Sequence, residues 1–261
     1  HYIKQVITNF PEVIERSVAT PATDNLYVVR DEATKKRLSE DQARIFHHTV
    51  AQLLFIAPRV RKDIQTAVAF LTTRVKDPDE DDWGKLKRVL KYLRSTVSLP
   101  LRLRAEHIGM IKWWVDASYA VHGDCRGQTG ATMSLGSGSI SSMSRKQKIN
   151  TRSSTEAELI GLHEALPQIL WTRYFIENQG YEVQQVMIFQ DNTSALRLEQ
   201  YGRESSGKQT KHIRVRYFFV KDRINAKDVT VGYCPTEQMI ADILTKPLQG
   251  SQFRKLRSSL Q

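Results

Sequence analysis

The chain has 261 residues, enough for two modest domains, and its 39 Lys and Arg against 28 Asp and Glu give a net charge of +11. It has no run of about 18 apolar residues, which predicts no membrane span. Its two cysteines, Cys125 and Cys234, show neither metal-site spacing nor a disulfide framework, as is typical of a reducing compartment. The charge, +6 on residues 1–105 and +5 on residues 106–261, indicates a polyanionic partner such as nucleic acid, the alternative being a soluble basic protein without one.

Residues 1–40 form a loop-rich lead-in. The chain starts His-Tyr-Ile-Lys, with neither a start Met nor a signal-peptide pattern, which predicts a piece of a longer polypeptide. Residues 2–10 fit a short helix or a strand, and the prolines at 11 and 21 break the pattern that follows.

Residues 41–105 have apolar residues at helical spacing. The pattern predicts helices over 43–56, interrupted by Pro58, then over 64–75 and 83–93. The acidic run 77–82 opens the third helix, so we interpret Asp81 and Asp82 as a helix cap and not as a metal site. The apolar stripes indicate packing and carry no chemistry.

From residue 101 onward, short strands alternate with helices. Strands are predicted at 111–118, 130–135 and 139–144, the last two joined by a hairpin at 136–138, and then at 185–190 and 229–233. Helices are predicted from Ser153 to about Asn178, kinked or restarted at Pro167, and over 195–200, 210–223 and from Thr236, with a loop over 202–209. This order predicts an α/β fold with a mixed sheet.

Four carboxylates lie at the edges of different predicted elements. Asp116 ends the first strand, Glu158 lies in the first helix after the hairpin, Asp191 ends the fourth strand, and Asp242 lies in the last helix. A single Asp after a strand is often only a turn residue, but four acids that converge repel one another unless divalent cations lie among them. Oxygen-only ligands favour Mg²⁺ or Mn²⁺, and two such ions about 3.5–4 Å apart suit phosphoryl displacement.

The second half contains five motifs in order over about 106–250: Val115-Asp116-Ala117-Ser118, Ser153-Ser154-Thr155-Glu156-Ala157-Glu158-Leu159, Gln190-Asp191-Asn192-Thr193-Ser194-Ala195, Thr210-Lys211-His212-Ile213 and Ile240-Ala241-Asp242-Ile243-Leu244-Thr245-Lys246-Pro247-Leu248. Together they resemble the ribonuclease H domain at the end of the Pol polyprotein of Ty1/copia-type LTR retrotransposons. Residues 41–105 resemble the thumb-like end of the reverse transcriptase. No aromatic-x-Asp-Asp polymerase motif occurs in the sequence, so the chain is not expected to polymerise by itself.

The resemblance implies an RNase H-like mixed five-stranded sheet flanked by helices over 106–250, followed by a basic tail or helix over 251–261. It implies that two Mg²⁺ ions, with Mn²⁺ as an alternative, serve endonucleolytic cleavage of the RNA strand of RNA·DNA hybrids during reverse transcription. The implied catalytic and metal-binding residues are Asp116, Glu158, Asp191 and Asp242. The implied partners are the hybrid and the rest of the polyprotein, with no membrane, in cytoplasmic virus-like particles, with the nucleus as a second location.

Glu156 competes with Glu158 for the metal site. The two residues lie about 200° apart around a helix, so both cannot face the metals. Glu158 fits the family's Glu-Leu-x-x-Leu turn, which leaves Glu156 as a first-turn partner of the helix dipole.

Five residues are candidates for nucleic-acid binding. Ser154 and Asn192 could contact 2′-hydroxyls, the alternative being that they serve as an N-cap and a helix-opening residue. Lys211, Arg214 and Lys221 could contact phosphates, the alternative being that they form a solvated helix face. We interpret His212 as a packing or capping residue. Cellular relatives carry a His shortly before the last acid, and residues 233–242 contain none, so turnover is expected to be slow.

Two other functions fit the same motifs. One is a DNA strand-transfer enzyme of the same fold, which uses three acids, so the fourth acid argues against it. The other is an inactive hybrid-binding or polymerase-supporting module. Exposed apolar surface on residues 40–100 is expected if the polymerase body is missing.

Overall fold

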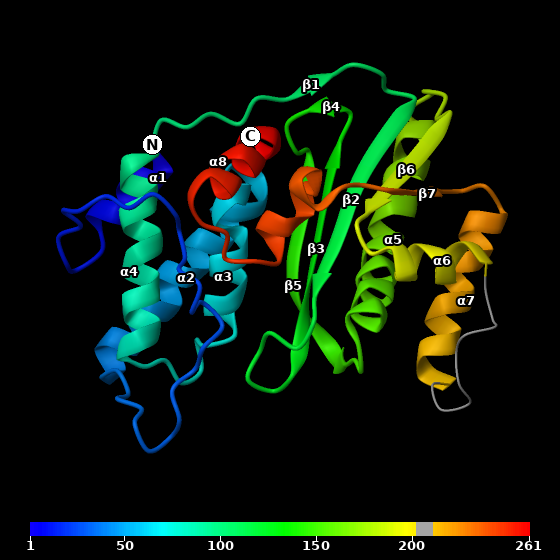
Figure 1. Cartoon of the computed structure of the whole chain (residues 1–261). Helices are drawn as coiled ribbons and strands as arrows, with labels where there is room; N and C mark the ends of the chain where they lie inside the picture. The colour runs from blue at the N-terminus through cyan, green and yellow to red at the C-terminus, as the bar shows by residue number, and fades with distance from the viewer. Residues whose placement is uncertain (202–210) are drawn as a thin grey trace.

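The computed structural model of the chain places a helical part beside a sheet with its own helices (Figure 1). The structure describes residues 1–201 and 211–261, with the side chains of 198–201 and 211–217 left undescribed. The predicted loop over 202–209 lies outside the described residues. None of the helices in these two ranges combines the length and the apolar character needed to cross a bilayer.

The helical part contains α1 (Tyr2–Thr8), α2 (Glu40–Val60), the 3₁₀ turn η1 (Lys62–Ile64), α3 (Gln65–Thr72) and α4 (Glu80–Ser95). Capping boxes start both long helices, because Ser39 pairs with Gln42 at α2 and Asp79 with Asp82 at α4. Asp82 is therefore part of a cap, as expected.

The expected break at Pro58 is wrong, because α2 runs on to Val60 and the chain leaves helical geometry at Arg61 (φ −132°, ψ 60°). Pro58 has no N–H to donate to the carbonyl of Leu54, and the helix continues for only two residues beyond it.

The five-stranded sheet has the order β5-β3-β2-β6-β7. β2 (Met110–Ser118) pairs antiparallel with β3 (Arg126–Ser134), which pairs antiparallel with β5 (Ser141–Asn150); β6 (Gln185–Gln190) and β7 (Thr230–Tyr233) add on the other side of β2 in parallel. The RNase H-like mixed sheet is confirmed. The expected hairpin is confirmed, because β3 and β5 pair antiparallel from Met133 and Ser141 onward. Its connection also holds β4 (Gly136–Ser137), which pairs with β1 (Arg104–Ala105), and Gly138 takes a φ of +72° that favours glycine.

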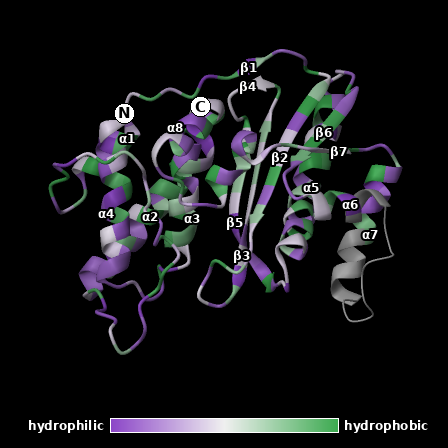
Figure 2. Cartoon of the chain, viewed as in Figure 1, coloured by the Kyte–Doolittle hydropathy of each residue, from purple (hydrophilic) through white to green (hydrophobic). Residues whose placement is uncertain are grey.

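The long helix α5 (Ser154–Asn178) covers one face of the sheet and runs through Pro167, so of the two possibilities expected there, a kink or a restart, the restart is wrong. α6 (Thr193–Tyr201) and α7 (Lys211–Asn225) lie beyond it (Figure 1). Apolar side chains of α5 and of β2 and β6 form one core, and hydrophobic residues are green along these strands in Figure 2. The residues in its centre include Ile111, Trp113, Val115, Leu162, Leu166, Ile169 and Ile188.

The chain after β7 forms two short 3₁₀ turns, η2 (Thr236–Gln238) and η3 (Ile240–Leu244), and then α8 (Gly250–Leu260). The expected α-helix from Thr236 is therefore wrong. Pro247 disfavours the helical conformation at residue 246, so a helix has little room between the prolines at 235 and 247. α8 and η3 bury apolar residues in the core of the helical part, namely Ile243, Leu244, Phe253, Leu256 and Leu260.

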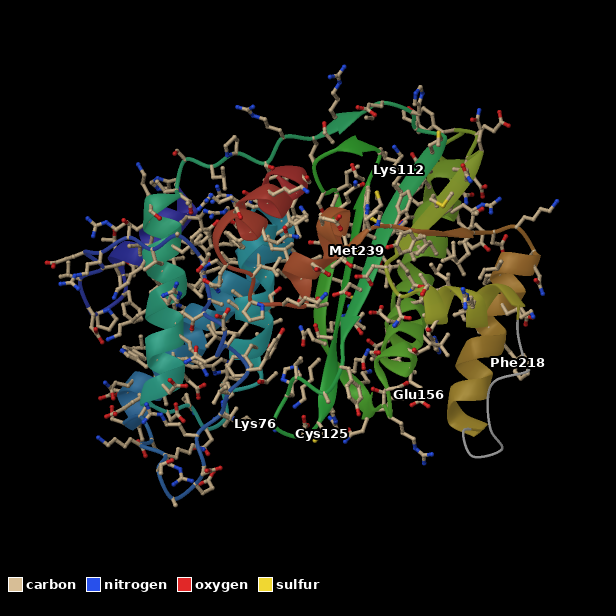
Figure 3. The ribbon with its side chains drawn as sticks, in the orientation of Figure 1. Lys76, Lys112, Cys125, Glu156, Phe218 and Met239 are labelled. Carbon is tan, nitrogen blue, oxygen red and sulfur yellow. The ribbon has the colours of Figure 1, made fainter. Side chains whose placement is uncertain are left out.

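Apolar side chains of α2 remain in contact with solvent. Leu54, Phe55 and Val60 are among the exposed large hydrophobic residues, as expected for residues 40–100. Cys125 is exposed in the turn between β2 and β3 (Figure 3), and Cys234 is buried. Both cysteines are free thiols, in line with the absence of a disulfide framework from the sequence.

Candidate metal centre

Two parallel strands deliver the first two carboxylates side by side. Trp113 and Val115 of β2 are buried against α5, and Asp116 follows them on the opposite side of the strand. β6 pairs with β2 in parallel through Trp114 and Phe189, and the same register carried on by two residues brings Asp191 level with Asp116. The ends of the two strands therefore place both acids at one edge of the sheet.

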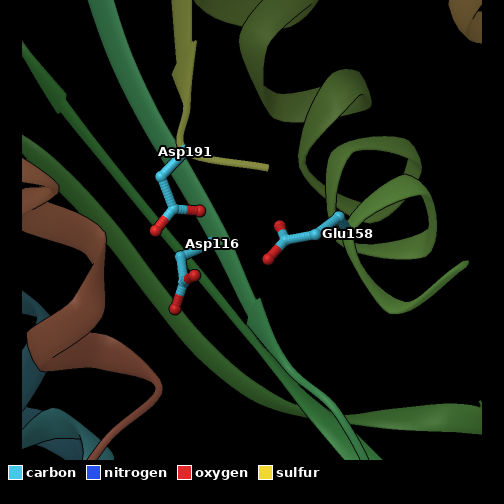
Figure 4. A group of neighbouring side chains, drawn as sticks. All are labelled: Asp116, Glu158 and Asp191. Carbon is cyan, nitrogen blue, oxygen red and sulfur yellow. The ribbon is translucent and has the colours of Figure 1, made fainter. Parts of the chain in front are cut away.

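The third carboxylate comes from the first turns of α5. Ser153 caps this helix by accepting a hydrogen bond from the backbone N–H of Glu156 (3.2 Å), so the cap is Ser153 and not Ser154. One turn further, a Cβ on Gly161 would lie 3.2 Å from the Cβ of Ala117, which shows how closely the helix approaches β2. This close approach directs Glu158 toward the strand ends (Figure 4).

Asp116, Glu158 and Asp191 together form a set of possible metal ligands. One carboxylate oxygen from each lies within 4.8 Å of the others. Asp116 is 1% exposed and Glu158 is 4% exposed, while Asp191 is half-buried. Ligands on opposite sides of one Mg²⁺ ion lie about 4 Å apart, so small side-chain movements would seat an ion.

The electrostatics of this set suit a cation. Burial, followed by the charges of Asp116 and Asp191, raises the pKa of Glu158 well above its usual value, and burial also raises the pKa of Asp116. The Oε2 atom of Glu158 is buried and has no hydrogen-bond partner among the described residues. A buried oxygen without a partner costs free energy unless a proton or a metal ion binds it. The donor set therefore fits a hard divalent cation.

Asp242 lies close to these acids but outside the set of three. Its Oδ1 accepts a hydrogen bond from the Nζ of Lys246 at 2.7 Å, and the same Nζ lies 3.6 Å from Oδ1 of Asp116. Burial, and next the charge of Asp116, raise the pKa of Asp242 to about 7. The structure thus brings three of the four predicted acids together and pairs the fourth with an ammonium group.

Glu156, the rejected alternative, has a different role. Its Oε2 accepts a hydrogen bond from the backbone N–H of Arg152 at 2.7 Å, and it lies at the solvent-facing start of α5 (Figure 3).

The predicted nucleic-acid ligands are only partly described. Ser154 is exposed at the start of α5, and Asn192 caps α6 by accepting hydrogen bonds from the backbone N–H groups of Ser194 and Ala195, both at 3.0 Å. Lys221 is half-buried on α7. The side chains of Lys211, His212 and Arg214 lie outside the described residues.

Sequence reasoning missed three residues next to the site. Thr245 donates a hydrogen bond from its hydroxyl to Oδ2 of Asp116, and Lys246 pairs with two acids. The position of Lys246 four residues after Asp242 was a usable signal for that pair, whereas no spacing pointed from Thr245 to Asp116. Tyr27 donates a hydrogen bond to the carbonyl of Thr245 at 2.7 Å, and no sequence pattern pointed to a residue more than two hundred positions away.

A shallow cavity of about 510 Å³ borders the site. Tyr27, Ser118, His122, Thr245 and Lys246 line part of its wall. The helical part and the sheet therefore meet next to the acids.

Known proteins resemble the chain over most of its length. It is 27% identical over 255 residues to a retrovirus-related Pol polyprotein from transposon TNT 1-94 of Nicotiana tabacum, matching 97% of the chain and 19% of that protein. It is 31% identical over 196 residues to a Pol polyprotein from transposon RE2 of Arabidopsis thaliana, matching 74% of the chain and 13% of that protein. The chain therefore spans less than a fifth of these polyproteins.

The chain was also compared with a shorter protein, with solved structures and with family models. A secreted RxLR effector protein 161 of Plasmopara viticola is 32% identical over 123 residues, which is 47% of the chain and 87% of that protein. Among solved structures, LC11-RNase H1 in complex with an RNA/DNA hybrid has a TM-score of 0.37 and 16% identity, over 52% of the chain and 93% of that protein. No family model matches the chain.

Proposed function

Because the chain belongs to the Pol polyproteins of Ty1/copia-type retrotransposons, we propose that it hydrolyses the RNA strand of RNA·DNA hybrids in a metal-dependent reaction. The observation that carries this proposal is the convergence of Asp116, Glu158 and Asp191 from three separate elements onto one edge of the sheet. The high positive charge of the chain supports a polyanionic substrate.

In this proposal Asp116, Glu158 and Asp191 hold one Mg²⁺ ion, with Mn²⁺ as an alternative. A second ion would use Asp116 and Asp242, which requires Lys246 to turn away from both carboxylates. A bound pair of such ions supplies a hydroxide nucleophile and stabilises charge on the attacking and leaving oxygens.

The protein's own groups orient the substrate and exclude water. β2 and α5 keep Asp116 and Glu158 buried, so the two carboxylates are fixed before a substrate arrives. Ser154 precedes Glu158 by four residues at the start of α5, and Asn192 directly follows Asp191, so both could contact the 2′-hydroxyls that distinguish RNA from DNA. Lys211, Arg214 and Lys221 belong to one helix and would contact phosphates.

We propose the location and the partners that the family implies. The chain would act beside the rest of the reverse transcriptase polyprotein in cytoplasmic virus-like particles, with the nucleus as a second location. The proposed division is a lead-in over 1–40, a thumb-like region over 41–105, the nuclease domain over 106–250 and a terminal segment over 251–261. That terminal segment is helical and packs with the thumb-like region.

A cleavage assay tests the proposal. Purified chain is incubated with labelled RNA·DNA hybrid, duplex DNA or duplex RNA, in Mg²⁺ or in EDTA, and only the hybrid in Mg²⁺ should be cut. Asp116→Asn and Asp191→Asn should each abolish cutting while hybrid binding remains. An intact hybrid in Mg²⁺ contradicts the proposal, and joining of DNA ends would indicate a strand-transfer enzyme.

A second candidate is a hybrid-binding module without cleavage. The specific observation in its favour is the ion pair between Lys246 and Asp242, which occupies the fourth acid. Binding of the hybrid with no cutting in either Mg²⁺ or Mn²⁺ would support this candidate.

A further inference from the structure

The segment that carries Asp242, Thr245 and Lys246 is held from two sides. On the sheet side, Ser144 of β5 donates a hydrogen bond to the carbonyl of Leu244 at 2.6 Å. On the helical side, Thr66 of α3 donates to the carbonyl of Ile243 at 2.6 Å, and Gln249 donates to the carbonyl of Ala22 at 2.9 Å. The position of this segment therefore depends on residues that precede the sheet in the sequence.

Thr245 connects the helical part directly to an acid of the site. Its side chain is fully buried, and its hydroxyl donates a hydrogen bond to Oδ2 of Asp116. Its backbone carbonyl accepts the hydrogen bond from the hydroxyl of Tyr27 at 2.7 Å, and a longer one from Ser118 at 3.4 Å. Tyr27 is thus linked to Asp116 through one residue, because Tyr27 holds the backbone of Thr245 and the side chain of Thr245 holds the carboxylate.

Tyr27 is itself fixed in place. Its ring packs edge-on against Phe70, with centroids 5.8 Å apart, and against His122, with centroids 4.8 Å apart. Only 8% of the residue is exposed. A ring held on two sides directs its hydroxyl to one acceptor, so the hydrogen bond to Thr245 is set by packing on the helical side.

We propose that Tyr27 is a positioning residue of the site, which orients the carboxylate of Asp116 through Thr245. The loop-rich lead-in and the helical part are then structural components of the nuclease site and not only remains of a polymerase. This inference rests on the proposed function, and it names residues outside the nuclease-like region on which that function depends. Removal of a group that orients a metal ligand in this way typically lowers metal affinity or activity by about 10–100-fold.

The decisive variant is Tyr27→Phe in the full chain, because it removes one hydroxyl and keeps the ring that packs on Phe70 and His122. The matched control is Tyr92→Phe, which removes another buried hydroxyl in the same part of the molecule, one that donates to Asp63 and accepts from Arg257. Tyr92 lies in α4, and its side chain contacts Asp63, Arg257 and Phe253 and not the acids of the site, as far as the chain is described.

Three measurements are compared, namely the melting temperature, the Mn²⁺ dissociation constant from the spin-resonance signal of free Mn²⁺, and kcat and KM on the hybrid. Tyr27→Phe should weaken Mn²⁺ binding and lower kcat about tenfold each, with KM changed by less than about twofold. Tyr92→Phe should lower the melting temperature similarly but leave Mn²⁺ binding and kcat unchanged.

Thr245 supplies the second test. Thr245→Val, which keeps the shape and removes the hydroxyl, should reproduce the effect of Tyr27→Phe, and Thr245→Ser should retain wild-type Mn²⁺ affinity. The double variant Tyr27→Phe, Thr245→Val should lose no more than Thr245→Val alone, since both act on one chain of bonds.

The inference is overturned if Tyr27→Phe binds Mn²⁺ as the wild type does, or if Tyr92→Phe loses as much Mn²⁺ affinity. A wild-type chain that binds Mn²⁺ but does not cut the hybrid contradicts the proposed function alone. The Mn²⁺ comparison of the variants still decides the role of Tyr27 in that case.

Discussion

The ammonium group of Lys246 lies 2.7 Å from Oδ1 of Asp242. The side chain of Asp242 is buried, whereas that of Lys246 is partly exposed. The same ammonium group lies 3.6 Å from Asp116. A single lysine thus offsets the repulsion between two buried acids at the place where a second divalent cation would bind.

Replacing Lys246 should make the fold depend on divalent cations. Lys246→Met leaves two buried carboxylates without their partner, which costs about 3–5 kcal/mol before the acids take up protons. We expect a lower melting temperature in EDTA and a larger recovery on addition of Mg²⁺ than the wild type shows. Lys255→Met, on α8, removes the same charge elsewhere and should show neither effect. Equal stabilisation of all three proteins by Mg²⁺ would contradict this prediction.

The metal-free chain should lose stability as the pH rises toward neutrality. Burial raises the pKa of Asp242 from 3.8 to about 7, so the folded state binds more protons than the unfolded state between these values. Stability therefore falls as the pH increases from about 4 to about 7, by up to about 4 kcal/mol for this group. Asp116 and Glu158, whose pKa values are also raised, act in the same direction.

Melting curves in EDTA at pH 5 and pH 8 measure this dependence. Asp242→Asn cannot ionise, so its melting temperature should change less between the two values and should exceed that of the wild type at pH 8. A variant with the same pH dependence as the wild type would show that Asp242 does not titrate in this range.

Two glutamates on one helix allow a matched test of the metal site. Glu158→Gln should abolish calorimetric Mg²⁺ binding and lower kcat by about a thousandfold or more, because it removes a buried ligand. Glu156→Gln should keep both within a few-fold, because Glu156 accepts a hydrogen bond from the N–H of Arg152 and interacts with the helix dipole. The reverse result would exchange the roles of the two residues.

Much of the fold follows from periodicity in the sequence. Runs of β-branched and aromatic residues gave β6 with its observed ends, and the pattern of α4 gave its position to within a few residues. Predictions from local sequence failed where tertiary contacts determine where a helix ends or which type of helix forms. Pro58 does not end α2, and the predicted last helix is two short 3₁₀ turns, and the apolar residues of the second, η3, pack into both parts of the molecule.

The site shows the same division. Asp116, Asp191 and Glu158 could be picked out because each follows a strand or opens a helix in the sequence. Thr245 matters only because η3 lies against the end of β2, and Tyr27 matters only because the helical part packs on that segment. These contacts join residues far apart in the chain, and no spacing in the sequence reports them.

Asn192 offers a way to separate capping from hydrogen bonding to the hybrid. Asn192→Asp keeps the oxygen that caps α6, so the free energy of unfolding should stay within about 0.5 kcal/mol of the wild-type value. It replaces the amide donor by a negative charge, which should raise KM for the hybrid about five- to tenfold. Asn178→Asp at the far end of α5 makes the same charge change and should leave KM for the hybrid nearly unchanged. An unaltered KM in Asn192→Asp would remove Asn192 from the hybrid interface.

Gly130 of β3 should prove necessary for the packing of the segment that carries Asp242. A Cβ at this position would lie 2.7 Å from Cγ2 of Thr245, 2.8 Å from Cβ of Leu244 and 3.0 Å from the carbonyl of Ala241. Gly130→Ala should therefore displace that segment, cost about 1–3 kcal/mol and lower kcat, because Thr245 moves relative to Asp116. Gly84→Ala is the matched control, since Gly84 lies inside α4 with nothing within 4 Å of the added Cβ. Alanine there should stabilise the helix by about 0.5–1 kcal/mol and leave kcat unchanged. If Gly130→Ala kept full stability and activity, β3 and the segment after Asp242 would not be in the close contact that the site requires.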